Sequence, residues 1–252
     1  MTNVSEVCVL PNIYVYSCVT DDYDLVLPPV LLREYRIKFV VFCESQTRAR
    51  GWHNRPCVRL FRSGILTNRF HKFFPHILFP NAQYSVYVDG NIGIIGDISI
   101  LLDEFIESEA AIGLFRHKDR ATVAEEMRAC LDMKKFDEDD LRFYQMQVDN
   151  MYLDGMPENQ RLTDNAVIFR WHNHPALPVA MDDWWAQLQS FTKRDQLSLP
   201  YVLWKNNVAT KIWNWSFRER NEYFEKYPHK GTLLRNIRIR LRNIISKSGL
   251  KK

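Results

Sequence analysis

The sequence predicts an α/β fold in which a mostly parallel sheet is flanked by helices. Short apolar runs rich in strand-forming residues alternate with longer helical stretches along the 252 residues. The run over residues 35–43 is almost continuously apolar towards its end, as expected for a strand covered on both faces. Ligand sites in such folds lie beyond the carboxyl ends of the strands, so polar residues directly after a strand are the first candidates.

The elements follow in order along the chain, and Pro75 predicts where the first helix ends because proline has no N–H to donate. The polar, arginine-rich segment 44–57 is expected to be a loop. We expect strands over 12–20, 35–43, 84–89, 110–115 and 166–170, and helices over 68–76, 98–107, 122–135, 137–152 and 181–191. Without a repeat or a Gly/Ser linker, one domain over 1–231 and a tail over 232–252 are predicted.

The composition, with 46% hydrophobic and 25% charged residues, is typical of a globular protein. No apolar run approaches the roughly 20 residues that cross a bilayer, and no charged-then-apolar leader is present, so a cytoplasmic location is expected. The cysteines form no C-x-x-C pair and no zinc spacing, which predicts reduced thiols; they are Cys8, Cys18, Cys43, Cys57 and Cys130.

The tail carries the basic character of the chain. Residues 234–252 contain seven Lys or Arg and no acid, so the rest of the chain has a net charge of −3 although the total is +4. An apolar stripe at helical spacing runs between the arginines and consists of Leu234, Ile237, Leu241, Ile244 and Ile245. This pattern predicts a basic amphipathic helix on the inner face of an anionic membrane; packing against the domain is the alternative.

The segment Tyr84–Ile94 is the most informative part of the chain. An apolar strand ends in Asp89, Gly90 and Asn91 and is followed by a second apolar run. Carboxylate and carboxamide oxygens suit Mg²⁺ or Mn²⁺, and a glycine lets the backbone approach a phosphate. The alternative is an ordinary Asx turn after a strand.

Basic side chains precede this strand tip. Arg69, Lys72 and His76 are placed to bind a diphosphate, although a solvated basic helix would have the same composition. His117 follows the strand over 110–115, where it predicts either a phosphate or acceptor contact or a surface loop.

Two further polar groups lie at the ends of the strand over 166–170. Asp164 precedes that strand, and His172 and His174 follow it. A His-x-His pair invites a zinc interpretation, but without a third soft ligand nearby in sequence local hydrogen bonding is favoured.

The segment Arg194-Asp195-Gln196 pairs a carboxylate with a carboxamide, which is what a hydroxyl-rich sugar needs for orientation. The alternative for Asp195 is a helix N-cap. Trp184 is expected in the core, with stacking on a sugar face as its alternative.

Eight motifs in order resemble one family. They are D-D-Y-D, R-F-H-K-x-x-P-H, Y-S-V-Y-V-D-G-N-I, H-x-x-R-x-x-x-x-E-E, G-M-P, R-W-H-N, W-W and R-D-Q-L-S, within residues 14–230. Together they resemble a glycosyltransferase-like domain long catalogued as a domain of unknown function. That domain occurs in bacterial surface-polysaccharide loci and in plant Golgi proteins implicated in cell-wall polysaccharide synthesis.

The resemblance implies a GT-A fold, a single Rossmann-like domain that uses a nucleotide-sugar donor, of which a UDP-sugar is the first expectation, and a divalent metal such as Mn²⁺ or Mg²⁺. On that analogy Asp89-Gly90-Asn91 corresponds to an Asp-x-Asp element that contacts the ribose and the metal. Asp195-Gln196 is similar to the Asp-Gln pair of family 8 transferases, and His229 to their late metal-binding histidine. Asn91 replaces a carboxylate, which weakens the implied metal site.

These observations predict a glycosyltransferase that moves a hexosyl-like sugar to a surface-polysaccharide or lipid-linked glycan acceptor, as in lipopolysaccharide or capsule synthesis. Asp164 or His117 is the candidate for a general base, if transfer is inverting. The alternatives are an inactive carbohydrate-binding or scaffold protein and a hydrolase. Nucleotide-binding P-loops, G-x-G-x-x-G loops, G-x-S-x-G elbows, H-E-x-x-H helices and nucleic-acid-binding patterns are absent from the sequence.

Overall fold

The computed structural model describes residues 11–30, 36–44, 49–132 and 138–232. The predicted tail helix therefore lies outside the described residues, apart from its first position. The strands are β1 Asn12–Val19, β2 Arg36–Cys43, β3 His53–Pro56, β4 Tyr84–Val88, β5 Ile92–Ile94, β6 Ile112–Arg116, β7 Thr163–Trp171, β8 Thr210–Trp213 and β9 Phe224–Lys226. The helices are α1 Gly64–Phe73, α2 Pro75–Leu78, α3 Ser99–Glu107, α4 Val123–Asp132, α5 Glu138–Leu153, α6 Ala176–Ser190 and α7 Asp195–Lys205.

The main sheet has seven strands in the order β3-β2-β1-β4-β7-β6-β8, and β5 pairs with β9 in a second, two-stranded sheet. Within the main sheet only β7 is antiparallel to its neighbours β4 and β6, whereas the other pairs are parallel. The predicted α/β class with a mostly parallel sheet is confirmed. No helix among the described residues is long and apolar enough to cross a membrane.

The reversed direction of β7 decides which residues share an edge of the sheet. Because β7 runs against the others, its first residues lie where β4 and β6 end: Thr163 is in register with Arg116, and Val167 with Val88. The last residues of β7 lie at the opposite edge, where the His172 amide donates to the Gln83 carbonyl at 2.8 Å. Asp164, near the start of β7, and His172, directly after its end, therefore lie at opposite edges of the sheet.

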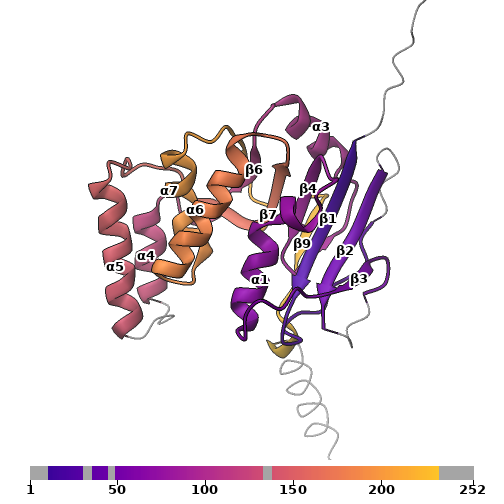
Figure 1. Ribbon diagram of the computed structural model, residues 1–252, viewed down its shortest axis with the longest axis horizontal. Coiled ribbons are helices and arrows are strands. Elements are labelled where there is room, and N and C mark those ends of the chain that lie inside the picture. Colours follow the sequence, from indigo (N-terminus) through magenta and orange to yellow (C-terminus); the bar gives the residue numbers. More distant parts are fainter. Residues whose placement is uncertain (1–10, 31–35, 45–48, 133–137, 233–252) are drawn as a thin grey trace, which may run out of the picture.

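Alternate residues of the central strands build two cores, one on each face of the sheet. Tyr16 faces the layer formed by α1, α6 and α7, with α4 and α5 outside α7 (Figure 1). Val15 faces α3 and the small β5–β9 sheet. In the first layer Phe73 stacks on Trp184, with ring centroids 3.7 Å apart and planes 9° apart.

The first helix begins four residues earlier than the sequence predicts. Ser63 caps it, accepting a hydrogen bond from the Leu66 amide at 3.4 Å, and this extends α1 back to Gly64. The segment predicted as a loop contains the edge strand β3, whose polar sequence and final Pro56 give no periodic signal. Four further elements were also missed: α7, β5, β8 and β9.

The β5–β9 sheet brings the end of the described chain back against the tip of β4. Its packing depends on Gly96, because a Cβ atom there would lie 2.0 Å from the backbone oxygen of Glu222. We expect Gly96→Ala to lower the free energy of unfolding by about 1–3 kcal/mol, measured by urea denaturation, since β9 must move to relieve the overlap.

Gly231→Ala is the matched control, because nothing lies within 4 Å of a Cβ atom at that position. Its free energy of unfolding should stay within about 0.5 kcal/mol of the unmodified chain. Equal stability of the two variants would contradict the close packing of β5 and β9.

Candidate active site

A cleft of about 910 Å³ opens at the edge of the sheet where β1 and β4 end. Segments that are far apart in sequence line it, from the end of β1 to the chain after β9. The lining residues are Cys18, Val19, Thr20, Asp21, Tyr23, Asp24, Ile65, Asn68, Arg69, Asp89, Gly90, Asn91, Phe143, Phe191, Thr192, Lys193, Arg194 and His229. The strand-end rule therefore located the cleft correctly.

Asp89 is held at the mouth of this cleft by its own backbone. Its amide donates to the Ala166 carbonyl at 2.8 Å, and its carbonyl accepts from the Ile92 amide at 2.9 Å. The side chain remains 32% exposed. A Cβ atom on Gly90 would lie 2.7 Å from Val19 and 2.9 Å from Asp24, so the glycine lets the strand tip pack against the end of β1.

Lys72 of α1 lies beneath Asp89 and is only 2% exposed. Its Nζ is 2.7 Å from Asp195 Oδ2 and 3.4 Å from Asp89 Oδ1, and Arg69 Nη2 is 3.2 Å from Asp195 Oδ1. Burial alone would raise the pKa of Asp195, but Arg69 and Lys72 outweigh it and lower that pKa to about 2. The ionised carboxylate thus joins α7 to α1 and, through Lys72, to β4.

His229 reaches the same cleft because β9 pairs with β5. Beyond that ladder the Tyr227 amide donates to the Asn91 carbonyl at 2.8 Å, and Asn91 Nδ2 donates to the Tyr227 carbonyl at 3.2 Å. Two residues later, His229 Nδ1 lies 2.7 Å from Asp24 Oδ1. Asp24, Asp89, Asn91 and His229 therefore share one wall of the cleft.

This wall has the donor chemistry of a site for Mn²⁺ or Mg²⁺. With Nδ1–H directed at Asp24, the Nε2 lone pair of His229 is left for a cation, and Asn91 keeps its amide oxygen. Burial raises the pKa of Asp24, His229 opposes that rise, and the nearby Asp89 adds to it, so a bound cation would favour the ionised carboxylates. In the described part of the chain, the ligand atoms of Asp24, Asp89 and His229 do not all lie within 4.8 Å of one another.

Three cations also line the cleft: Arg69, Lys193 and Arg194. Arg194 is oriented from behind by Glu126, whose Oε1 accepts from Arg194 Nη2 at 3.0 Å. Glu126 is itself buried and also pairs with Arg120. The cleft is therefore lined by both carboxylates and cations.

His117 and Asp164 lie behind the cleft and do not line it. The His117 ring is buried, its Nδ1 accepts the Asp119 and Arg120 amides at 3.2 and 3.1 Å, and burial lowers its pKa. Asp164 is fully buried, pairs with Arg218 and accepts the Ala166 amide at 3.1 Å. A general base must reach the acceptor hydroxyl, so the structure does not support that role for either residue.

Besides Lys72 and Asp195, which lie beneath it, three other predicted residues lie outside the cleft lining. Trp184 is fully buried against Phe73 and cannot stack on a sugar; its Nε1 donates to the Asp195 carbonyl at 3.1 Å. His76 belongs to α2, and burial and Arg170 lower its pKa. Gln196 Nε2 donates to the Thr163 carbonyl at 2.6 Å. Gln196 therefore fixes α7 to β7.

Three residues of the cleft lining that the site uses were not predicted from the sequence: Asp24, Asn68 and Lys193. Asp24 belongs to the D-D-Y-D motif, which was its only signal, and it is the partner of His229. Asn68 donates through Nδ2 to the Cys18 carbonyl at 2.7 Å and accepts from Arg69 Nη1 at 2.9 Å. It therefore orients Arg69 towards the cleft from the neighbouring position of α1.

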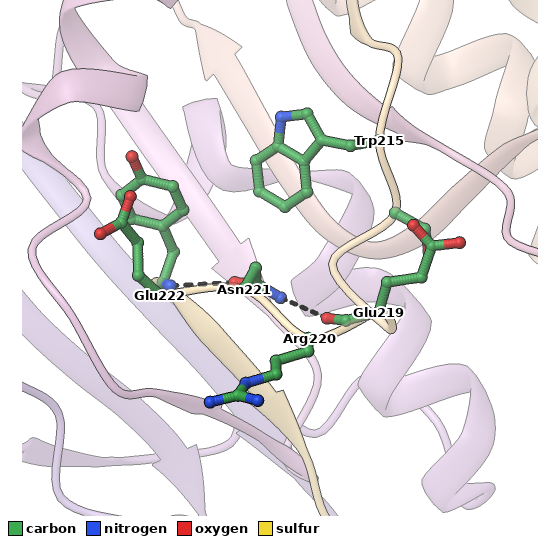
Figure 2. Close-up of a pocket in the computed structure, with 7 residues that line it drawn as sticks. Trp215, Glu219, Arg220, Asn221 and Glu222 are labelled. Atoms are coloured by element: carbon green, nitrogen blue, oxygen red, sulfur yellow. Dashed lines mark hydrogen bonds between the residues drawn. The ribbon is translucent and has the colours of Figure 1, made fainter.

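A second hollow, of about 290 Å³, lies in the segment after β8 (Figure 2). Trp215 and Tyr223 line it, with ring centroids 5.9 Å apart. Asn221 shapes its floor: Nδ2 donates to the Glu219 carbonyl at 2.7 Å, and Oδ1 accepts from the Tyr223 amide at 2.9 Å. This segment also supplies Arg218, the partner of Asp164.

Comparisons with known proteins agree with this architecture. The structure is similar to mouse xyloside xylosyltransferase 1, with a TM-score of 0.51, 12% sequence identity, and coverage of 80% of this chain and 85% of that one. The fold is therefore GT-A-like. Residues 53–229 match the family model "TOD1/MUCI70, glycosyltransferase-like domain", and the chain belongs to that family. The resemblance noted in the sequence is confirmed.

A curated relative is the probable hexosyltransferase MUCI70 of Arabidopsis thaliana, which is 27% identical over 232 residues. The match covers 81% of this chain and 39% of that protein. The chain thus spans about two fifths of the relative's length.

The low pKa of Asp195 predicts how the stability of the fold changes in acid. Its pKa falls from 3.8 to about 2 on folding, so this carboxylate stabilises the fold above about pH 4, and that contribution is lost as the pH falls towards 2. We expect Asp195→Asn to lower the free energy of unfolding at pH 7 by about 3 kcal/mol, because buried Lys72 loses its nearest partner. Urea unfolding over a pH series should show this deficit shrinking between pH 4 and 2.

Asp154→Asn is the matched control, because Asp154 also pairs with a lysine, Lys205, but at the surface. The hydrogen bond from Tyr201, with Lys205, also lowers the pKa of Asp154, but this carboxylate is at the surface, so its effect at pH 7 and the change of that effect on acidification should both be small. A deficit in Asp195→Asn that does not shrink on acidification would contradict the ionised network beneath the cleft.

Proposed function

We propose that this chain is a glycosyltransferase that transfers a sugar from a nucleoside diphosphate, with a UDP-sugar as the first candidate. The observation that carries the proposal is that one cleft is lined both by carboxylates, Asp24 and Asp89, and by the cations Arg69, Lys193 and Arg194. Family membership and the GT-A-like fold support the same reaction class. The cleft volume is in the range that holds ligands of this size.

Breaking a sugar–phosphate bond develops negative charge on the leaving diphosphate. Fixed cations stabilise such charge because they need no reorganisation as it appears. Arg69 is fixed by Asp195, and Arg194 by Glu126, so both guanidinium groups are held before the ligand arrives. In this proposal Asp195 is a positioning residue, which holds Arg69 and Lys72 and does not itself bind the sugar hydroxyls.

The proposed reaction includes a bound divalent cation, either Mn²⁺ or Mg²⁺. Asp89, Asn91 and His229 would hold it, and Asp24 would keep the imidazole oriented. Such an ion supplies positive charge to the diphosphate when it is bound. The residues of the chain bind and orient the donor around it.

The acceptor remains the surface-polysaccharide or lipid-linked glycan expected from the sequence. A basic tail over 233–252 would bring the domain to the inner face of an anionic membrane in the cytoplasm, where lipid-linked acceptors are available. This part of the proposal rests on the sequence pattern and on the reaction class.

A nucleotide panel tests the proposal. Thermal unfolding of the full chain with UDP, GDP or CMP, each with and without Mn²⁺, should show a rise in Tm with UDP that is larger with Mn²⁺. Asp89→Asn should abolish this rise in Tm, because its affinity for the nucleotide should fall at least tenfold. Asp132→Asn, on the exposed side of α4, should keep the rise. No rise with any nucleotide would favour a non-catalytic carbohydrate-binding or scaffold protein.

The role of Asp24 gives a separate metal prediction. Removing the partner that orients a ligating histidine typically weakens metal affinity by about 10–100-fold. We therefore expect Asp24→Asn to weaken the affinity for Mn²⁺ by about this factor. Paramagnetic resonance of free Mn²⁺ during a titration measures this directly. Asp22→Asn, two residues away and paired with Lys230, is the control and should retain the affinity; an equal loss in both variants would contradict the assignment.

A further inference from the structure

Three side chains from separate elements converge beside the cleft. Cys18 lies near the end of β1, Cys57 directly follows β3, and His71 lies in α1. Their ligand atoms all lie within 4.8 Å of one another, and within the described part of the chain this is the only such group of Cys, His and acidic residues. The sequence excludes the usual zinc spacings, but it contains no information on this spatial cluster.

The separations suit a tetrahedral ion with thiolate ligands. Cys18 Sγ and Cys57 Sγ are 4.0 Å apart. Two Zn–S bonds of about 2.3 Å at a tetrahedral angle place their sulfurs about 3.8 Å apart. The cluster therefore needs only a small adjustment to accept zinc.

His71 is prepared as the nitrogen ligand. Its Nδ1 lies 2.7 Å from the Thr67 carbonyl, which can only accept, so Nδ1 carries the proton and Nε2 has the lone pair. A backbone hydrogen bond on the far nitrogen is the usual way of orienting a metal-binding histidine. Burial lowers the pKa of His71, which keeps the ring in the neutral, ligating form.

Little has to move for a metal to reach Nε2. At present Nε2 accepts the Val58 amide at 3.0 Å. Val58 lies in the irregular segment between β3 and α1, and its side chain is exposed. That amide can therefore turn to solvent at low cost when an ion takes the lone pair.

The two thiols differ in their surroundings: Cys18 is buried, and burial raises the pKa of its thiol, so the metal itself must displace that proton. Cys57 is only partly buried, which gives an ion a route in, and its hydrogen bond with Cys18 lowers the pKa of Cys57. Binding replaces the two S–H protons by two S–Zn bonds and releases two protons to solvent. No electrons are transferred.

We propose that Cys18, Cys57 and His71 form a zinc site that fixes α1 to the sheet. A water molecule completes the coordination from the side of Cys57. The site is separate from the Asp89 wall, because soft thiolates select zinc whereas oxygen ligands select Mg²⁺ or Mn²⁺. Since α1 also carries Arg69 and Lys72, a bound ion would hold the cations of the cleft in place. The inference does not depend on the proposed reaction.

Cobalt substitution tests the site. Reduced full-length chain, freed of metal by a chelator, is titrated with Co²⁺ and followed by absorption. The expected result is one Co²⁺ per chain with a thiolate-to-cobalt band in the near ultraviolet and the strong visible bands of tetrahedral cobalt, both displaced by Zn²⁺. Zn²⁺ should also raise the Tm of the unmodified chain.

Matched variants identify the ligands. Cys57→Ser replaces the partly exposed thiol and should remove the thiolate band and the zinc-dependent rise in Tm. Cys43→Ala should keep both, because Cys43 is in register with Val19 and so faces the other side of the sheet from Cys18. Asp89→Asn should also keep the thiolate band, which separates this site from the cleft.

Several outcomes would overturn the proposal. One is cobalt binding without a thiolate band, and another is an unchanged band in Cys57→Ser. A third is failure to take up metal, including the case in which peptide mapping under non-reducing conditions shows that Cys18 and Cys57 have instead been oxidised to a disulfide by dissolved oxygen.

Discussion

The burial of Lys72 is the constraint on which the rest of this structure depends. An ammonium group that is 2% exposed has lost almost all of its hydration, and only close carboxylates can compensate for that loss. Asp195 and Asp89 provide the compensation, from the start of α7 and the end of β4. The ion pairs of Lys72 thus fix α1, β4 and α7 relative to one another. The cleft lies where these three elements meet.

The reversed strand β7 determines which side chains support that point. It carries the Ala166 carbonyl, which holds the Asp89 amide, and the Thr163 carbonyl, which holds Gln196. In the parallel direction the same strand would present its histidine end to the cleft. The antiparallel direction provides backbone acceptors and buried Asp164 there, and sends His172 to the opposite edge.

The sequence predicted the elements whose signal is local. The strands β1, β2 and β4 are apolar and long enough to stand out, and Asp89 was identified because it ends one of them abruptly. The direction of β7 leaves no trace in its own residues, because a buried strand has the same pattern in either direction. Strands β5 and β9 have three residues each, which is too short for a period to show.

There are also physical reasons why some residues predicted for the site lie outside the cleft. Lys72 and His76 are four apart and would share a face of one continuous helix. Pro75 instead ends α1 and starts α2, so His76 turns towards Arg170. Trp184 was correctly expected in the core; only its alternative role as a sugar platform fails, because α6 directs it onto Phe73. The meeting of His229 with Asp24 depends on the β5–β9 pairing, which no local pattern reveals.

That pairing also bears on how the protein folds. Asp24 and His229 are separated by 205 positions in the sequence, and they meet only after β9 has paired with β5. Contacts between such distant positions carry a large loop-closure entropy and tend to form slowly. The central strands and their helices can assemble earlier from shorter loops. Competence to bind a ligand should therefore appear as a late kinetic phase of refolding, after most of the secondary structure has formed.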